Sequence, residues 1–141
     1  MAEILPEKLD LEIVAPTRQV FAGAVQEVTV PGREGYLGIL PGHAPLLSEL
    51  KPGLVSFVED GVRTVLYSGW GFVEVLPDRV SVLVEEAEFP DEVDVEAAMA
   101  ARSEAEAALH SHSSELNYTE VMERWEAAVA RLQVAGVAPG S

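Results

Sequence analysis

The sequence contains no cysteine and few basic residues, and each shortage excludes a class of protein. Without cysteine the chain cannot form a disulfide framework, a thiolate nucleophile or a thiolate zinc site. Its 9 Lys and Arg residues face 24 Asp and Glu residues, which gives a formal net charge of −15. Because such a charge repels phosphate backbones and anionic lipid headgroups, we expect the chain to bind neither nucleic acid nor a membrane surface.

Long uncharged segments are also missing. No stretch approaches the roughly 20 apolar residues of a membrane-spanning helix, so we expect no direct insertion into a bilayer. The acidic residues Glu3, Glu7 and Asp10 differ from the basic start of a signal or transit peptide, which predicts an unprocessed cytosolic chain. Apolar residues make up 48% of the 141 residues, a share that favours one packed core.

The composition changes near residue 90. Residues 1–90 hold 9 of the 11 glycines and 8 of the 9 prolines, residues 91–135 hold neither, and 12 alanines follow position 90. Glycine and proline mark turns, whereas alanine favours helix. The change predicts a strand domain over residues 1–90 and a helical domain over residues 91–141.

The first segment consists of short runs of strand length separated by turn signals. Between two of them, Asp60-Gly61 is a strong hairpin signal, because a type I′ turn needs positive φ at both central residues. Seven or more short strands must bury one face against another sheet, which predicts a sandwich or a flattened barrel. The expected strands are residues 9–14, 25–30, 36–40, 54–58, 62–67, 72–76 and 80–84.

The second segment has the spacing of two helices. Asp94 is placed to cap the first, and Asn117 with Glu120 forms a start like a capping box for the second. The expected inner stripe of the first helix is Ala97, Ala101, Ala105, Ala108 and Leu109, and that of the second is Val121, Trp125, Ala128, Val129 and Leu132. A short polar turn joins them, which predicts an antiparallel helical hairpin.

Three glutamates near the end of the strand segment raise one chemical hypothesis. Cleavage of a glycosidic bond uses two carboxylates, so Glu85, Glu86 and Glu88 leave open a carbohydrate-active or carbohydrate-binding sandwich. Strand alternation would place Glu86 and Glu88 on one face and Glu85 on the other. A solvated rim is the favoured interpretation of that arrangement.

The three histidines raise another hypothesis, a small metal-binding module built on His43, His110 and His112. The two later histidines are two residues apart, so they do not share a helix face. His43 lies in a loop stiffened by Pro41 and Pro45, and no nucleophile pattern accompanies it. The glycines at 32, 35 and 38 meet neither nucleotide-binding pattern, so we expect no enzyme activity, no cofactor and no metal.

A family resemblance is carried by residues 28–47, Val-Thr-Val-Pro-Gly-Arg-Glu-Gly-Tyr-Leu-Gly-Ile-Leu-Pro-Gly-His-Ala-Pro-Leu-Leu, and by Lys-Pro-Gly at 51–53. With residues 71–75, 80–88, 93–94 and 130–134, this pattern resembles the epsilon subunit of F-type proton-transporting ATP synthases. The resemblance implies an antiparallel β-sandwich of about ten strands followed by an antiparallel two-helix hairpin. It also implies a non-catalytic rotor subunit that couples proton flow through the membrane ring to ATP synthesis in the catalytic head.

The resemblance further implies partners and contact residues. The expected partners are the gamma subunit of the central stalk, the membrane ring of proton-carrying subunits, and the catalytic alpha and beta subunits when the hairpin extends. The expected location is peripheral, on the cytoplasmic side of the cell membrane. Glu34, Tyr36, His43 and Pro45 are the residues that the resemblance assigns to partner contacts, in loops that present Tyr36 and His43.

The family's nucleotide-binding pattern is incomplete in this sequence. The residues that correspond to it are Glu88, Val93, Asp94 and Ala98, whereas Ala97 stands where the pattern has Arg. Arg131 is then the chief matching basic residue for nucleotide binding. We therefore expect weak or absent ATP binding. Residues 91–141 carry 3 Arg against 10 acidic residues, so we also expect little charge attraction between the hairpin and an acidic loop of the catalytic subunits.

Overall fold

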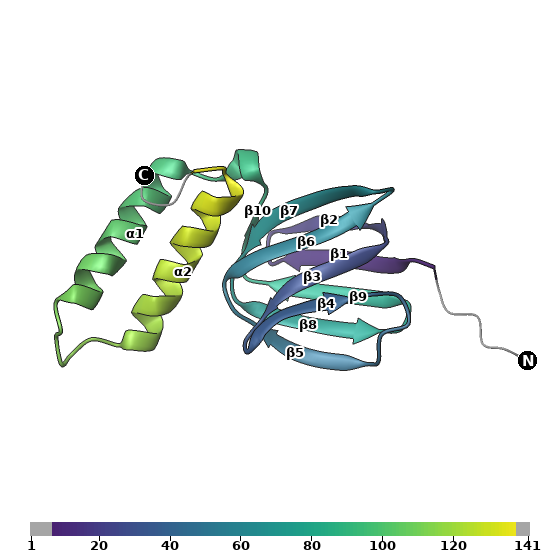
Figure 1. Cartoon of the computed structure of the whole chain (residues 1–141), viewed down its shortest axis with the longest axis horizontal. Coiled ribbons are helices and arrows are strands. Elements are labelled where there is room, and N and C mark those ends of the chain that lie inside the picture. The colour runs from purple at the N-terminus through teal and green to yellow at the C-terminus, as the bar shows by residue number, and fades with distance from the viewer. Residues whose placement is uncertain (1–6, 138–141) are drawn as a thin grey trace, which may run out of the picture.

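The computed structural model describes residues 7–137, and residues 1–6, which include Glu3, and 138–141 lie outside it. The strands are β1 (Leu9–Ala15), β2 (Arg18–Val25), β3 (Glu27–Gly32), β4 (Gly35–Ile39), β5 (Leu46–Leu50), β6 (Gly53–Glu59), β7 (Val62–Ser68), β8 (Gly71–Leu76), β9 (Arg79–Val84) and β10 (Ala87–Glu88). A short 3₁₀ helix η1 (Pro90–Glu92) then leads into the helices α1 (Val95–His110) and α2 (Tyr118–Val134). Figure 1 shows the strands at one side and the two helices together at the other.

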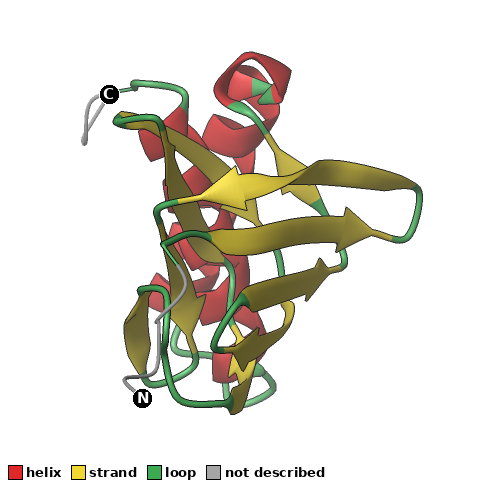
Figure 2. Cartoon of the chain, turned by 90° about the vertical axis from the view of Figure 1, so that its right-hand side faces the viewer, coloured by secondary structure: helices red, strands yellow, loops and turns green. Residues whose placement is uncertain are grey.

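Alternating side chains drive the strands into a layered sandwich. In β1 the residues Leu9, Leu11 and Ile13 are buried, while Asp10 and Glu12 between them are exposed. The hydrogen-bonded order is β10-β7-β6-β3-β5-β8-β9-β1-β2, with β4 paired to β3. Figure 2 shows the strands wrapping around the interior. The core between the layers is almost wholly aliphatic, with Phe57 as its one fully buried aromatic residue among those described.

The predicted strands and the hairpin turn are largely confirmed. Asp60 and Gly61 have φ values of 48° and 80°, as a type I′ turn between β6 and β7 requires. Residue 25 of the run 25–30 ends β2, and residues 27–30 belong to β3. The rest of β2 and all of β5 and β10 lie outside the runs expected from periodicity. One pairing differs from the antiparallel sandwich that the sequence predicts, because β1 pairs with β9 in parallel. These two strands are distant in sequence, so no tight turn sets their direction.

Both predicted helix caps are confirmed. The side chain of Asp94 accepts a hydrogen bond from Ala97 N at 3.0 Å, and that of Asn117 accepts one from Glu120 N at 3.1 Å. The stripe predicted for α2 is confirmed at Val121, Ala128 and Leu132, which are buried.

The stripe predicted for α1 is confirmed at Ala105, which is buried, but not at Ala97 and Ala101. Ala98 and Ala105 are buried, whereas Ala97 and Ala101 are exposed. Alanines occupy so many positions of α1 that methyl groups line more than one face, and sequence periodicity cannot distinguish these faces.

The hairpin lies against the outer side of the sheet mainly through α2. Helix α2 packs on β6 and β7, and α1 packs on the far side of α2, as Figure 1 shows. Within residues 7–137 neither helix is long and apolar enough to cross a membrane.

Candidate functional site

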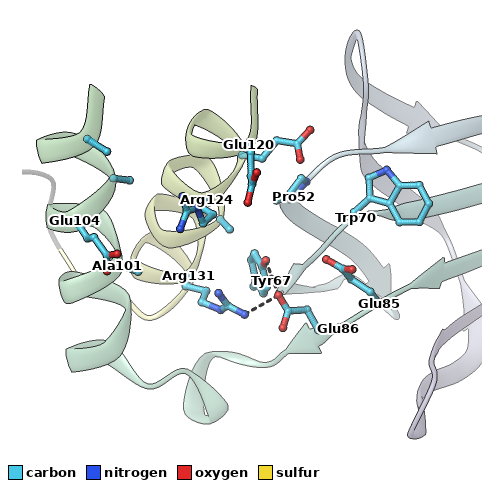
Figure 3. A pocket seen from close by; sticks show the side chains of 14 residues that line it. Pro52, Tyr67, Trp70, Glu85, Glu86, Ala101, Glu104, Glu120, Arg124 and Arg131 are labelled. Atoms are coloured by element: carbon cyan, nitrogen blue, oxygen red, sulfur yellow. Dashed lines mark hydrogen bonds and ion pairs between the residues drawn. The ribbon is translucent and has the colours of Figure 1, made fainter. Parts of the chain in front are cut away.

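The junction between hairpin and sandwich is organised around Arg131 of α2. Its guanidinium lies 2.8 Å from Glu86 Oε1, and its Nε donates to Glu88 Oε1 at 3.0 Å. The same guanidinium lies 4.2 Å from the ring centroid of Tyr67 on β7, a cation–π distance. Figure 3 shows Arg131 reaching from α2 toward Glu86 and Tyr67. A single cation thus joins the end of α2 to two carboxylates and one aromatic ring of the sandwich.

Tyr67 lies beneath this contact and is buried, although it points away from the sandwich core. Its hydroxyl donates to Glu86 Oε1 at 3.2 Å. Burial raises the pKa of Tyr67 above its ordinary value, and the charge of Arg131 opposes that rise only in part. The phenol therefore stays neutral at every pH at which the fold is ordinarily studied.

Two weaker ion pairs join the other half of α2 to the sandwich. Arg33 lies 3.9 Å from Glu123, and Lys51 lies 3.5 Å from Glu126. In these pairs the sandwich supplies the cation, whereas in the Arg131 cluster it supplies the carboxylates. The charges on α2 are therefore complementary to those on the sandwich when the helix runs in the observed direction.

The linker has its own anchor. Arg18 donates to both oxygens of Glu92 in η1 at 2.8 and 2.9 Å and to the Ala87 carbonyl at 2.9 Å. The bond from Arg18, helped by one from Phe89 N, lowers the pKa of Glu92 to about 2. The linker is held to the sandwich as far as Glu92, independently of the helices.

The residues of the incomplete nucleotide pattern come together here. Glu88, Asp94 and Arg131 line one cavity of about 360 Å³, with Ala97 also in its wall. Each matched polar group is already engaged, because Arg131 binds Glu88 and Asp94 caps α1. The family resemblance named these residues as a nucleotide pattern but did not indicate the internal pairing that satisfies them.

The residues expected at partner contacts do not form one patch. Glu34 follows Arg33 in the turn beside α2. Tyr36 lies in strand β4 and not in the expected loop, and its hydroxyl accepts a hydrogen bond from Leu54 N at 3.1 Å. His43 and Pro45 lie at the opposite end of the strands, where Gly42 N donates to the Pro77 carbonyl at 2.8 Å. The four residues therefore mark two separate ends of the sandwich.

A surface that the sequence analysis did not select lies on the outer side of β1, β8 and β9. Phe72 of β8 pairs directly with Leu83 of β9, which pairs with Val14 of β1, so three apolar side chains form a row. Phe72 is 43% exposed and Leu83 53% exposed. Trp70 continues the row, edge-on to Phe72 at 5.0 Å between ring centroids. We call these four residues the apolar face. The sequence did contain a signal for this face. Phe72 and Leu83 occupy strand positions at which alternation between buried and exposed residues predicts a polar side chain.

The glutamates considered for carbohydrate chemistry are arranged differently from the prediction. The chain bends after β9, so Glu85 and Glu86 line the same pocket of about 370 Å³ beside α1 and α2, not opposite faces of a strand. Figure 3 shows both at its sandwich wall. Glu86 and Glu88 are ion-paired with Arg131. Their shared counterion, Arg131, joins the hairpin to the sandwich. This structural role gives no support to the carbohydrate hypothesis.

The histidines do not converge. His43 follows Gly42, which is bonded to Pro77, at the end of the sandwich away from the helices. His110 ends α1, and its Nδ1 lies 2.8 Å from the Glu106 carbonyl. Among residues 7–137 no group of three His, Asp or Glu side chains is placed to hold a metal ion. The metal-module hypothesis therefore has no structural basis in this part of the chain.

Two family models match the chain in succession. The beta-sandwich domain of the ATP synthase Delta/Epsilon chain matches residues 8–90, and the long alpha-helix domain of the same chain matches residues 91–136. The ATP synthase epsilon chain of Geotalea daltonii is 45% identical over 133 residues, covering 94% of this chain and 96% of that protein. That of Geotalea uraniireducens is 44% identical over 135 residues, covering 95% and 98%.

Solved structures share the fold at lower identity. A chain of the Euglena gracilis mitochondrial ATP synthase, in a structure of OSCP, F1 and the c-ring, matches with a TM-score of 0.80 and 23% identity, covering 94% of this chain and 84% of that chain. A chain from the central stalk and c-ring of the Tetrahymena thermophila enzyme matches with a TM-score of 0.63 and 12% identity, covering 91% and 96%. With both domain models matched in order and relatives identical at more than two in five positions, this chain belongs to the family of ATP synthase epsilon chains.

Proposed function

We propose that this chain is a non-catalytic central-stalk subunit of ATP synthase that couples proton flow through the membrane ring to ATP synthesis. Membership in the epsilon family carries the assignment to the complex. The partners follow as parts of the proposal. They are the gamma subunit, the membrane ring, and the catalytic alpha and beta subunits when the hairpin extends.

The observation that carries the proposal is the apolar face. Helix α2 covers β6 and β7, but no described element covers Phe72 and Leu83 on β8 and β9. Adjacent exposed apolar side chains on a monomer mark an interaction site. Trp70 adds an aromatic ring of the kind that dominates binding energy at protein interfaces. We assign this face to the gamma subunit.

The two ends of the sandwich then have separate roles in the proposal. Glu34 and Tyr36 lie beside the hairpin, whereas His43 and Pro45 lie at the other end. We propose that the two pairs contact different partners, the central stalk and the membrane ring. The proposal includes a peripheral location at the membrane, on the cytoplasmic side. The helical domain, residues 91–141, is the regulatory part of the proposal.

Coupling assays test the proposal. The variants Tyr36→Ala and His43→Ala in the assembled enzyme should lower proton-driven ATP synthesis while leaving the melting temperature of the subunit nearly unchanged, because both side chains are partly exposed. The purified chain alone should not hydrolyse ATP. Turnover that disappears when a residue of this chain is changed would contradict the proposal.

A further inference from the structure

We infer that the groove between α1, α2 and the sandwich is a docking site for a basic amphipathic helix of a partner protein. The groove consists of two neighbouring cavities, of about 370 and about 360 Å³, which share Ala101 and Arg131 in their walls. The inference goes beyond the proposed function, because the gamma subunit and the membrane ring are assigned there to other surfaces. Only Trp70 belongs both to the groove and to the apolar face.

One wall of the groove is a stripe of alanines on α1. Ala97, Ala101, Ala105 and Ala108 line the cavities at helical spacing. Periodicity predicts that this stripe is buried, yet Ala97 and Ala101 are exposed. Among the described elements, α1 packs extensively only on α2. Small residues in a row along a helix let a second helix approach closely, so the stripe has the form of a packing seam whose partner is not among residues 7–137.

The opposite wall belongs to the sandwich and carries two aromatic rings. Tyr67 of β7 and Trp70 line it together with Pro52. Figure 3 shows this wall facing α1, with Arg124 and Arg131 of α2 between the two. Alanine methyl groups on one side and aromatic rings on the other suit the apolar face of an amphipathic helix.

The polar lining of the groove is acidic. Eight carboxylates line the two cavities, against two cations, Arg124 and Arg131. Arg131 neutralises two of the carboxylates. Glu85, Glu104 and Glu120 are exposed and make no ion pair within residues 7–137. A helix that carries Lys or Arg beside its apolar face would place positive charges against them.

Charge also selects among the possible occupants. A second copy of this chain would bring a net charge of −15, and its residues 91–141 have only 3 Arg against 10 acidic residues. Like charges that face each other across an interface oppose binding. A linear polyamine would match the charge but leave the alanine stripe uncovered. A basic amphipathic helix satisfies both the stripe and the carboxylates.

The test uses the full chain and a synthetic helical peptide as the probe. The peptide has 16 residues, the length of α1, with Leu and Ala on one face and Lys on the other. A matched peptide carries Glu in place of Lys. Binding is followed by the fluorescence anisotropy of a dye on the peptide, at low and high NaCl. We expect the Lys peptide to bind, the Glu peptide not to bind, and salt to weaken the binding.

Ala101→Arg should weaken binding of the Lys peptide about tenfold or more, because it obstructs the groove where the two cavities meet and adds a like charge. Ala107→Arg is the matched control. It makes the same change in the same helix, at an exposed position that lines neither cavity, and should bind like the unsubstituted chain. Circular dichroism and thermal unfolding check that both variants fold.

A second pair of variants keeps the test decisive if Ala101→Arg disturbs the hairpin. Glu104→Gln preserves the shape of a side chain in the groove and should weaken binding of the Lys peptide and its response to salt. Glu96→Gln removes the same charge from an exposed position of α1 that lines neither cavity, and should change neither quantity.

Equal affinities within each pair of variants, or no binding of the Lys peptide at millimolar concentrations, would overturn the inference. Binding of spermine without binding of the peptide would assign the groove to small polyamines and overturn the helix. Dimerisation that Ala101→Arg prevents, seen by sedimentation, would assign it to a second copy of the chain. Gamma binding is measured separately on the same proteins. A chain that binds gamma but not the peptide refutes this inference alone, and one that binds the peptide but not gamma refutes the proposed function alone.

Discussion

Truncating Phe72 should weaken gamma binding without unfolding the sandwich. The side chain is 43% exposed on the apolar face. A phenylalanine carries roughly 200 Å² of surface, so covering that fraction removes about 85 Å² from water. At about 25 cal/mol per Å², the burial contributes about 2 kcal/mol, and Phe72→Ala should raise the dissociation constant roughly 10- to 30-fold.

The assay is a titration of immobilised gamma subunit with the purified chain, accompanied by thermal unfolding. The cost to folding should stay near 1 kcal/mol, the scale of the lost edge-on contact with Trp70. Val62→Ala is the control, since Val62 is 66% exposed on β7 and lies outside the apolar face. An unchanged dissociation constant for Phe72→Ala, or a loss of stability above about 3 kcal/mol, would show that Phe72 serves the fold and not the interface.

Three further predictions concern binding and stability. Calorimetric titration of the isolated chain with ATP should show weak or no binding, because Arg131 is already paired with carboxylates and Ala97 supplies no cation; a micromolar dissociation constant would contradict this. Gly71→Ala should destabilise the sandwich by about 3 kcal/mol in urea unfolding, because a Cβ there would lie 2.8 Å from Val84 Cα and clash with the Leu83 carbonyl, whereas Gly38→Ala, with open space around it, should change stability by less than about 0.5 kcal/mol. The folded pKa of Glu92 lies below its unfolded value of 4.5, so its contribution to stability is present above pH 4.5 and is lost as pH falls toward 2; Glu92→Gln should flatten that part of the acid unfolding profile, and an unchanged slope would show that the bond to Arg18 contributes little.

Periodicity predicted the strands and helices whose side chains differ sharply between faces. It missed β2, where Val20, Phe21 and Ala22 do not alternate between apolar and polar, and β10, which has only two residues. In α1 the abundance of alanine hid the buried stripe. The helix caps were predictable, because each depends on residues three positions apart in the chain.

The functional surfaces were harder to predict, because each depends on residues that are distant in sequence. Arg131 and Glu88 are 43 positions apart, and nothing local in either segment indicates that they pair. The sequence analysis missed the apolar face for a different reason. Alternation places Phe72 and Leu83 on the outer face of their strands, but that they lie side by side is evident only when the strand register is known. The family resemblance indicated the complex to which the chain belongs. The structure identified the surface through which we propose that the chain binds to that complex.

The central claim is tested most directly by adding the purified chain to membranes whose ATP synthase has been stripped of its epsilon subunit, and by measuring ATP synthesis driven by a proton gradient. We predict that the unsubstituted chain rebinds to the stripped enzyme and restores synthesis, and that Phe72→Ala requires a higher concentration for the same effect. The claim would be contradicted if the folded chain neither bound the stripped enzyme nor changed its rate of synthesis.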